Sequence, residues 1–438
     1  MNYREARAYL LEAGKAGSRP GLETIGELLR RLGNPQDRLR FIHVAGTNGK
    51  GSLIAYLAAV LKEAGYRTGS YTSPAVFSYR ERYQVNGEYI SEEVFARQLS
   101  AAAEAGESMR RDGQTGPTCF ELETAAAFLY FLEQGCEFVV LEAGMGGLLD
   151  ATNIIKTTVL EVLVSISLDH MDFLGSTLGE IARQKAGIIK PGTRVVSAAQ
   201  EPEAEVVIRE IAAAQHSALQ VVESASLRVR DSTLGAQSFD YKQWKNVRIQ
   251  LAGAYQFKNA ALALEGIEAL RALGYEITDA QALKGMYEAV WRGRFTQILA
   301  RPTVILDGAH NEAAAVELRR SLELYFSGRE LYYIMAVFKD KEYRDIIALT
   351  APLARHIIAV ETPGNPRALP AEELREAIAE VQPSVESAVS IRKAVQRLLA
   401  TVDPDAVIVI FGSLSVLGEA EQAVREASEE LRADGVLL

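Results

Sequence analysis

The feature that most constrains the fold of this 438-residue chain is a glycine-rich segment, VAGTNGKGS, at residues 44–52. It follows a short apolar run, FIHVA at 41–45, and precedes a helical pattern over 53–63 that ends before Gly65. This order predicts a buried strand, a tight loop and a helix. A unit of this kind typically opens a parallel α/β sheet.

The loop has the chemistry of a phosphate site. Its three glycines let a phosphate approach the backbone, Lys50 supplies a positive charge, and a helix starting near Ser52 adds the positive end of its dipole. The usual pattern G-x-x-x-x-G-K-[ST] is not met, because Val44 takes the first glycine position and Gly51 separates the lysine from the serine. Taken alone, the segment is also compatible with a tight connection that binds nothing.

Strand and helix patterns alternate along the rest of the chain. Residues 1–33 predict two amphipathic helices, and short β-like segments between about 195 and 251 predict a small antiparallel edge sheet. Other predicted helices span 121–133 and 259–273, and predicted strands span 138–141, 159–166, 303–306, 331–336, 356–360 and 406–411. Because a new alternating series starts after Trp291, we expect a domain boundary within 293–302.

Composition restricts the class of protein. Lys and Arg number 47 against 57 Asp and Glu, which gives a net charge of -10 and argues against broad binding of nucleic acid or anionic membranes. Two cysteines are too few for a disulfide framework, and no apolar stretch approaches the ~20 residues that a membrane-spanning helix needs. The N-terminus lacks the apolar core of a signal peptide. We therefore expect a cytoplasmic protein.

Acidic residues follow the predicted strands near the glycine-rich loop. Glu142 ends a strand before the turn AGMGGLLDATN, and Asp169 and His170 stand at the end of the next strand. A carboxylate at this edge of a sheet is suited to Mg²⁺, whereas imidazole nitrogen is a weaker candidate. A capping role for Glu142 is the alternative. Lys185 by itself reads as a surface lysine on a helix.

The second half of the chain carries residues suited to a nucleotide cleft. Asp307 and His310 in TVILDGAHN come directly after a predicted strand, where ligands of α/β folds bind. In WRGRF at 291–295, Arg294 is placed to clamp a phosphate near the hinge, while we interpret Arg292 as solvated.

Seven motifs in this order resemble those of folylpolyglutamate synthases and bifunctional dihydrofolate synthases, in the Mur ligase superfamily. They are LGNPQDRLRFIHVAGTNGKGS, YTSPAVFSYRERYQVNGEYI, LEAGMGGLLDATN, SISLDHMDFLGSTLGEIARQKAGIIKPG, GAYQFKNAALAL, GRF and LDGAHN. The resemblance implies an α/β protein with a P-loop-type parallel-sheet ATPase domain at residues 1–297. A smaller Rossmann-like α/β domain is implied at 298–438, with ATP and Mg²⁺ between the two.

The resemblance also implies roles for individual residues. The implied ATP contacts are Gly46, Thr47, Asn48, Gly49, Lys50, Gly51, Ser52, Asn259, Arg294, Asp307 and His310. The implied magnesium ligands are Ser73, Glu142 and His170, and the implied substrate contacts are Arg82, Phe120 and Asp150. Catalytic roles are implied for Lys50, Lys185, His170 and Arg294, with Lys185 carried as a carbamate.

The implied activity is ATP-dependent addition of L-glutamate to a folate-type carboxylate through an acyl phosphate, in a monomer. The acceptor is a tetrahydrofolate, dihydropteroate or both, and the motifs do not decide between them. Ala75 and Leu148 replace the His and Arg usual in the family near the pterin site, and Gln184, Tyr255 and Arg292 are further departures. Two alternatives stay open: a Mur-type ligase for another acceptor, and a nucleotide-binding regulator or ATPase without ligase activity.

Overall fold

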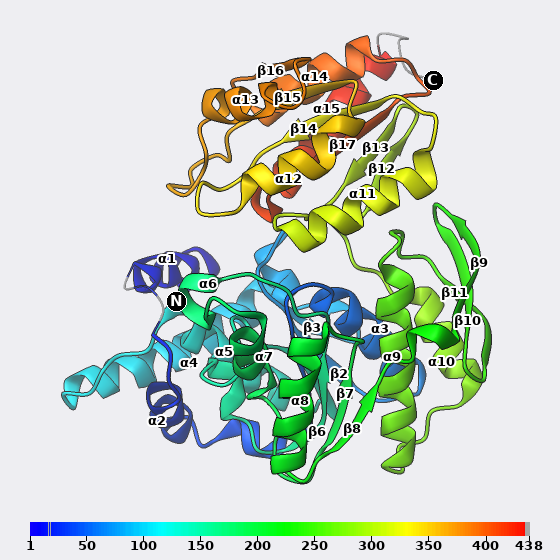
Figure 1. Ribbon diagram of the computed structural model, residues 1–438. Coiled ribbons are helices and arrows are strands. Elements are labelled where there is room, and N and C mark those ends of the chain that lie inside the picture. The colour runs from blue at the N-terminus through cyan, green and yellow to red at the C-terminus, as the bar shows by residue number, and fades with distance from the viewer. Residues whose placement is uncertain (16, 18, 434–438) are drawn as a thin grey trace.

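The computed structural model describes residues 1–15, 17 and 19–433, and it consists of two α/β units, each with its own sheet (Figure 1). This confirms the predicted fold class of two parallel-sheet units. The second sheet starts with β12 (Thr296–Ala300), two residues before the expected boundary at 297/298.

The larger sheet has eight strands in the order β4, β3, β2, β5, β1, β6, β7, β8. The neighbouring strands β2, β5, β1, β6, β7 and β8 are parallel to one another. At one edge of the sheet, β3 and β4 are added in antiparallel pairing. The strands are β1 (Phe41–Ala45), β2 (Thr68–Tyr71), β3 (Tyr83–Val85), β4 (Glu88–Tyr89), β5 (Phe138–Glu142), β6 (Thr158–Leu163), β7 (Arg194–Ser197) and β8 (Ala218–Val221). Because β1 lies between β5 and β6, the loop that follows it emerges at the centre of the sheet.

Helices cover both faces of this sheet. Alternate residues of β1 show the division: Ile42 and Val44 pack with α3 and α9, while Phe41 and Ala45 face the opposite side. One face carries α3 (Lys50–Glu63), α9 (Gln256–Ala272) and α10 (Asp279–Glu288). The other carries α1 (Tyr3–Gly14), α2 (Glu23–Arg31), α4 (Glu92–Arg111), α5 (Cys119–Glu133), α7 (Leu178–Ala186) and α8 (Pro202–Ala214).

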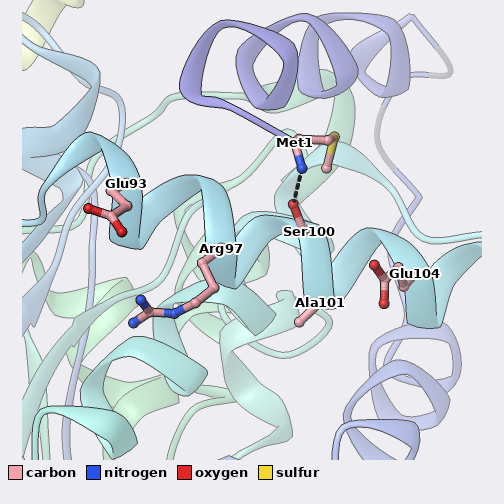
Figure 2. A pocket seen from close by; sticks show the side chains of 6 residues that line it. All are labelled: Met1, Glu93, Arg97, Ser100, Ala101 and Glu104. Atoms are coloured by element: carbon pink, nitrogen blue, oxygen red, sulfur yellow. Dashed lines mark hydrogen bonds between the residues drawn. The ribbon is translucent and has the colours of Figure 1, made fainter.

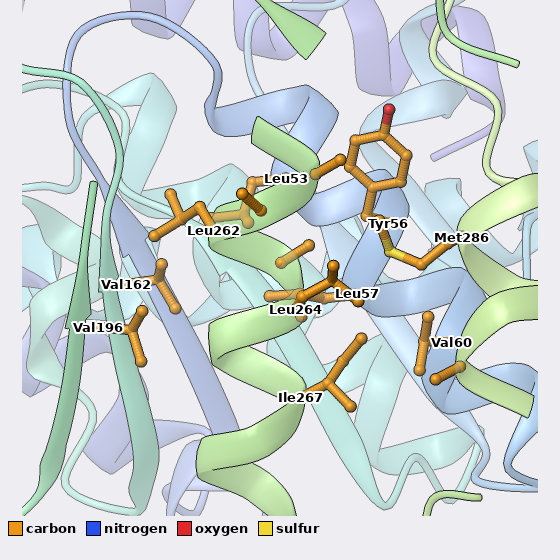
Figure 3. Packing of buried hydrophobic residues seen from close by; sticks show 14 of the residues in the cluster. Leu53, Tyr56, Leu57, Val60, Val162, Val196, Leu262, Leu264, Ile267 and Met286 are labelled. Carbon is orange, nitrogen blue, oxygen red and sulfur yellow. The ribbon is translucent and has the colours of Figure 1, made fainter. Parts of the chain in front are cut away.

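The apolar contact between α3, α9 and α10 fixes the position of the helix that follows the glycine-rich loop. Leu53, Tyr56, Leu57 and Val60 on α3 meet Leu262, Leu264 and Ile267 on α9 and Met286 on α10, above Val162 and Val196 of the sheet (Figure 3). These side chains are almost fully buried. Burying each large side chain contributes about 1.5–3 kcal/mol, so α3 is held firmly behind the loop.

The segment 195–251 differs from the prediction. Its first part supplies β7, α8 and β8, which extend the parallel sheet. Only β9 (Leu227–Thr233), β10 (Ala236–Tyr241) and β11 (Trp244–Ile249) are antiparallel, and they form a separate three-stranded sheet instead of an edge of the large one. Phe239 and Val247 of this small sheet pack into the core around α9, because its inner face is apolar.

The second unit is a six-stranded sheet in the order β12, β13, β17, β14, β15, β16, parallel except for β12. Its other strands are β13 (Thr303–Leu306), β14 (Leu331–Met335), β15 (His356–Ala359), β16 (Val385–Ser387) and β17 (Val407–Phe411). One face packs against α11 (Glu312–Phe326), α12 (Tyr343–Thr350) and α13 (Ala371–Ala379). The other packs against α14 (Ile391–Thr401) and α15 (Leu417–Ala433).

Short helical turns complete the chain. They are η1 (Pro35–Arg38), η2 (Tyr79–Arg82), η3 (Ala151–Ile154), α6 (Met171–Leu174), η4 (Ser224–Ser226), η5 (Ala351–Leu353) and η6 (Leu414–Val416). Within the described part of the chain, every helix is too short or too polar to cross a membrane.

Candidate active site

The glycine-rich loop lies at the carboxyl end of the central strand β1 and leads directly into α3. The helix begins at Lys50, two residues earlier than predicted, because Gly49 adopts a left-handed conformation with φ of 99° and ends the turn. Gly46 has φ of 144°, and a Cβ there would lie 2.2 Å from Cγ2 of Val164. Both positions therefore require glycine.

Neighbouring segments hold this loop in place. The N–H of Thr47 donates to the carbonyl of Ser165 at 2.8 Å, and its hydroxyl donates to the carbonyl of Ser167 at 3.1 Å. On the other side, Gln256 at the start of α9 donates through Nε2 to Ser52 Oγ at 3.0 Å and accepts from Asn259 Nδ2 at 3.1 Å. Asn259 is thereby fixed beside the loop.

Two lysines converge on one carbonyl of the loop. Lys50 Nζ lies 3.1 Å from the carbonyl oxygens of both Gly46 and Thr47, and Lys185 Nζ donates to the same Gly46 oxygen at 3.0 Å. Lys185 is only 3% exposed, contrary to its reading as a surface lysine. Burial, reinforced by the charge of Lys50, lowers the pKa of Lys185 to about 7.

Glu142 and Ser73 lie together opposite Lys50. Glu142 ends β5 and is buried, with Oε2 accepting from the N–H of Ser73 at 2.9 Å and Oε1 lying 3.8 Å from Lys50 Nζ. Burial raises the pKa of Glu142, whereas Lys50 and the Ser73 N–H oppose that shift. Among the described residues, no three His, Cys, Asp or Glu side chains gather into a metal-binding group. One carboxylate beside a serine still fits Mg²⁺, which usually takes its remaining ligands from water and phosphate.

His170 does not join that pair through any hydrogen bond in the described structure. It follows β6 by seven residues, because the strand ends at Leu163 and not at 166, so Asp169 and His170 occupy a loop and not a strand end. Its side chain is 42% exposed. Removal from water and the nearby lysines 341, 185 and 50 lower the pKa of His170, although Asp169 opposes them. The ring is therefore neutral near pH 7.

Asp307 and His310 occupy the turn after β13 in the second unit. Asp307 Oδ2 accepts from the N–H of Phe295 at 2.8 Å and from the hydroxyl of Tyr255 at 3.2 Å, and Oδ1 accepts from the Ala309 N–H at 2.8 Å. His310 Nδ1 bonds the carbonyl of Gly308 at 2.7 Å. Since a carbonyl only accepts, Nδ1 carries the proton and Nε2 stays available. Loss of solvent lowers the pKa of His310 to about 4.

The two arginines of the WRGRF motif differ in environment. Arg294 packs over the Asp307–Gly308 turn, where a Cβ on Gly308 would lie 2.4 Å from its Nη1. Its charge opposes the burial-induced rise in the pKa of both Glu142 and Asp307. Arg292 is not simply solvated, because it pairs with Glu421 on α15 and its guanidinium lies 4.1 Å from the centre of the Phe77 ring.

Four side chains join the two units next to the loop. Asn48 Nδ2 donates to Asn311 Oδ1 at 3.1 Å, Asn311 Nδ2 donates to Asp169 Oδ2 at 3.2 Å, and Lys341 Nζ lies 2.5 Å from Asp169 Oδ1. We call these four residues the interdomain cluster. The motif LDGAHN already placed Asn311 in the turn expected to face the phosphate loop, but its bonds to Asn48 and Asp169 were not predicted from the sequence. The N-cap position of Asn311 before α11 was a second signal, whereas the contribution of Lys341 was missed.

Two of the three expected substrate contacts, Phe120 and Asp150, contact the loop after β5. Phe120 packs on Gly144, where a Cβ would lie 2.6 Å from its ring, and Asp150 accepts from the Met145 N–H at 2.9 Å. Arg82 is buried and already engaged, since it forms an ion pair with Glu123 and donates to the Tyr71 hydroxyl at 3.1 Å. Its guanidinium is therefore committed to the protein interior.

A surface hollow on α4 is unrelated to these residues. It is lined by Met1, Glu93, Arg97, Ser100, Ala101 and Glu104, with the N-terminal amine donating to Ser100 Oγ at 3.0 Å (Figure 2). None of the expected site residues lines it.

A phosphate loop on one sheet, facing acidic and basic residues from a second sheet, defines a two-domain enzyme that uses a nucleotide. Comparison with known families agrees with this class. Residues 44–265 match the Mur ligase middle domain, and residues 293–414 match the Mur ligase glutamate ligase domain.

Individual relatives narrow the class. The chain is 37% identical over 382 residues to the dihydrofolate synthase/folylpolyglutamate synthase of Bacillus subtilis, covering 86% of this chain and 88% of that protein. A Mycobacterium tuberculosis folylpolyglutamate synthase complexed with ADP and AMPPCP superposes with a TM-score of 0.86 at 30% identity, over 96% of this chain and 99% of the other. E. coli FolC in complex with DHPP and ADP gives 0.84 at 28% identity, over 96% and 98%. The chain belongs to the folylpolyglutamate and dihydrofolate synthase family of Mur ligases.

Proposed function

We propose that this protein joins L-glutamate to the carboxylate of a folate-type acceptor, using ATP and releasing ADP and phosphate. The observation that carries the proposal is the convergence of Lys50 and Lys185 on the Gly46 carbonyl, with Glu142 buried opposite them. The B. subtilis relative is named for both folylpolyglutamate and dihydrofolate synthesis. The named relative and the phosphate loop support the same chemistry.

The acceptor carboxylate must be activated, because oxide is too poor a leaving group for direct attack by an amine. Transfer of the terminal phosphoryl group of ATP to the carboxylate gives an acyl phosphate, and the glutamate amine then displaces phosphate to form the amide. Lys50 and Arg294 neutralise charge on the transferring group. Asn259, Asp307 and His310 hold the rest of the nucleotide between the two units.

Glu142, Ser73 and His170 are the residues we assign to magnesium, with Glu142 as the principal ligand. The ion, when bound, supplies positive charge to the phosphate oxygens. Glu142 is ionised when it does so, and the charge of Lys50 favours that form despite burial. His170 contributes a neutral ring on the solvent side.

We assign a carbamate to Lys185. The ammonium group first loses one proton. The free amine then attacks carbon dioxide, an N–C bond forms and a second proton leaves, so that the cation becomes an anion. A pKa of about 7 leaves a large fraction of the amine unprotonated at neutral pH, and burial protects the product from water. An anion at this position pairs with Lys50, which a second ammonium group does not.

Two acceptors are to be compared. E. coli FolC binds DHPP according to its structure, and dihydrofolate synthesis by the B. subtilis relative supports a dihydropteroate activity for this chain. Leu148, whose side chain is 42% exposed, stands where the family usually has arginine. The acceptor therefore meets no positive charge at this position. We expect ligation to reduced folates to persist and ligation to dihydropteroate to be slower.

We further propose that the chain acts as a monomer, and that the boundary between its two domains lies near residue 297. Each of the two sheets has its own apolar core, which supports the division into two domains. Sedimentation at assay concentrations tests the monomer.

The test of the function is release of ADP by the purified protein in the presence of ATP and Mg²⁺, with acceptor and glutamate added separately and together. A ligase forms the glutamylated product only with both. Hydrolysis of ATP at the same rate without acceptor indicates the ATPase alternative.

A further inference from the structure

His43 is a buried polar side chain that the proposed mechanism does not use. It lies in the middle of β1, two residues before Ala45 and the phosphate loop, and has no exposed surface. Its Nε2 lies 2.9 Å from Thr152 Oγ1 in η3. A histidine in the centre of an apolar sheet is costly unless its polar atoms are satisfied, so this contact needs an explanation.

The direction of the hydrogen bonds follows from the atoms involved. Thr152 Oγ1 lies 2.6 Å from Asp150 Oδ1, and an ionised carboxylate only accepts, so the single hydroxyl proton of Thr152 points to Asp150. Thr152 Oγ1 must then accept from His43, whose Nε2 carries the ring proton. His43 Nδ1 is left bare, in agreement with its lack of a partner among the described residues.

Asp150 connects Thr152 to the loop after β5 through hydrogen bonds. Its Oδ2 accepts from the N–H of Met145 at 2.9 Å, and Oδ1 also accepts from the N–H of Thr152 at 3.0 Å. Asn153 Nδ2 donates to the carbonyl of Leu148 at 3.0 Å, which holds the second half of the loop 144–150. A chain of hydrogen bonds therefore runs from the centre of β1 to the loop.

The loop 144–150 in turn borders the expected acceptor site. Gly144 lies under the Phe120 ring, and a Cβ on Gly147 would lie 2.7 Å from the carbonyl of Lys185. A rotation of the Asp150 carboxylate would therefore move a surface that touches both Phe120 and the backbone of the catalytic lysine.

We propose that His43 is a positioning residue which, through Thr152, orients the Asp150 carboxylate and fixes the loop 144–150 for acceptor binding. The inference rests on the proposed assignment of Asp150 to the acceptor. It predicts an effect on acceptor binding and none on ATP binding, although His43 is on the strand that leads into the phosphate loop.

The test compares KM values for acceptor and ATP in H43L, H43Q, T152V and T152S. H43L and T152V should each raise the acceptor KM about tenfold, because a buried partner is left unsatisfied, with the ATP KM within twofold of wild type. H43Q and T152S keep a donor and a hydroxyl and should restore most of the binding. In the double variant H43L/T152V the effects should not add, since both break the same chain.

T158V is the matched control for T152V. Thr158 on β6 is also buried, but its hydroxyl has no partner in the described structure, so T158V should leave both KM values unchanged. Hydrogen exchange at the Met145 amide gives a readout independent of activity, and exchange should be faster in H43L and T152V than in T158V. Should H43L not fold, the T152V and T152S pair decides.

Three results overturn the inference in distinguishable ways. If D150N keeps the wild-type acceptor KM, Asp150 is not an acceptor residue and the inference falls with that assignment. If D150N raises the acceptor KM while H43L and T152V change neither KM nor Met145 exchange, the role of His43 is wrong and the assignment of Asp150 survives. A rise of the ATP KM equal to that of the acceptor KM indicates a general structural defect and also contradicts the proposal.

Discussion

Lys341→Met is expected to weaken the closed arrangement of the two units more than any surface substitution. Lys341 Nζ lies 2.5 Å from Asp169 Oδ1, and the two side chains are only 12% and 7% exposed. Methionine keeps the length of the side chain but removes the charge, so Asp169 stays buried without its cation. Breaking one side of a buried pair costs about 3–5 kcal/mol.

The expected kinetic effect follows from that magnitude. We call the arrangement in which the interdomain cluster joins the two units closed, and an arrangement without these contacts open. If about 3 kcal/mol of the cost falls on the closed state alone, its population relative to the open state falls by about 100-fold, since 1.4 kcal/mol is a factor of ten. kcat/KM for ATP should decrease by a similar factor. X-ray scattering with nucleotide and acceptor bound should show a larger radius for K341M than for wild type.

Lys339→Met is the matched control. Lys339 is exposed on the same loop and forms no ion pair within the described structure. D169N in the K341M background should recover part of the loss, because it removes the unpaired charge. If K341M behaves like K339M, or if the effects of D169N and K341M simply add, the ion pair between Lys341 and Asp169 does not hold the two units together.

Other variants test separate parts of the site. Lys50→Ala should lower kcat by about 1,000-fold without changing the far-UV circular dichroism, because the lysine acts on the transferring phosphoryl group; turnover within a few fold of wild type removes it from the mechanism. Glu142→Gln should strongly raise the Mg²⁺ concentration needed for half activity, and His170→Ala should raise it less. Magnesium titrations that match the wild type in both variants would contradict the ligand assignment. Activity should rise between pH 6 and pH 8, because Lys185, with a pKa of about 7, loses its proton there and becomes able to add carbon dioxide. An activity that stays the same when dissolved carbon dioxide is removed and then returned would count against the carbamate. Burial alone raises the pKa of Asp169, but His170 and Lys341 bring it well below its usual range, so the interdomain ion pair should persist above about pH 4 and be lost only in stronger acid.

Strands with strong apolar runs could be located from the sequence, and two of them were predicted to the residue, whereas the predicted strand 159–166 is β6 at Thr158–Leu163. The runs at 41–45 and 303–306 match β1 and β13 because both are buried on their two faces and bounded by polar residues. β2 was missed, since TGSY has little apolar character. Gly69 is needed there because a Cβ would lie 2.7 Å from the Phe131 ring, a constraint that comes from α5 and not from the strand itself.

The residues of the candidate site also fall into those that the sequence predicts and those that it does not. The phosphate loop, Glu142 and Asp307 follow strands, so the rule that ligands bind at the carboxyl ends of parallel strands predicts their location. The interdomain cluster could not be predicted, because Asn48 and Asn311 are 263 residues apart and no local pattern pairs them. The burial of Lys185 and Arg82 likewise depends on which segments fold over them.

The mass of the product formed from ATP, Mg²⁺, L-glutamate and either a reduced folate or dihydropteroate shows directly whether the protein is a folate ligase. We expect the reduced folate to gain one glutamyl residue for each ADP released, and dihydropteroate to react more slowly. Release of ADP with neither acceptor modified would contradict ligation. Transfer of an amino acid to a cell-wall nucleotide precursor instead would contradict the folate acceptor.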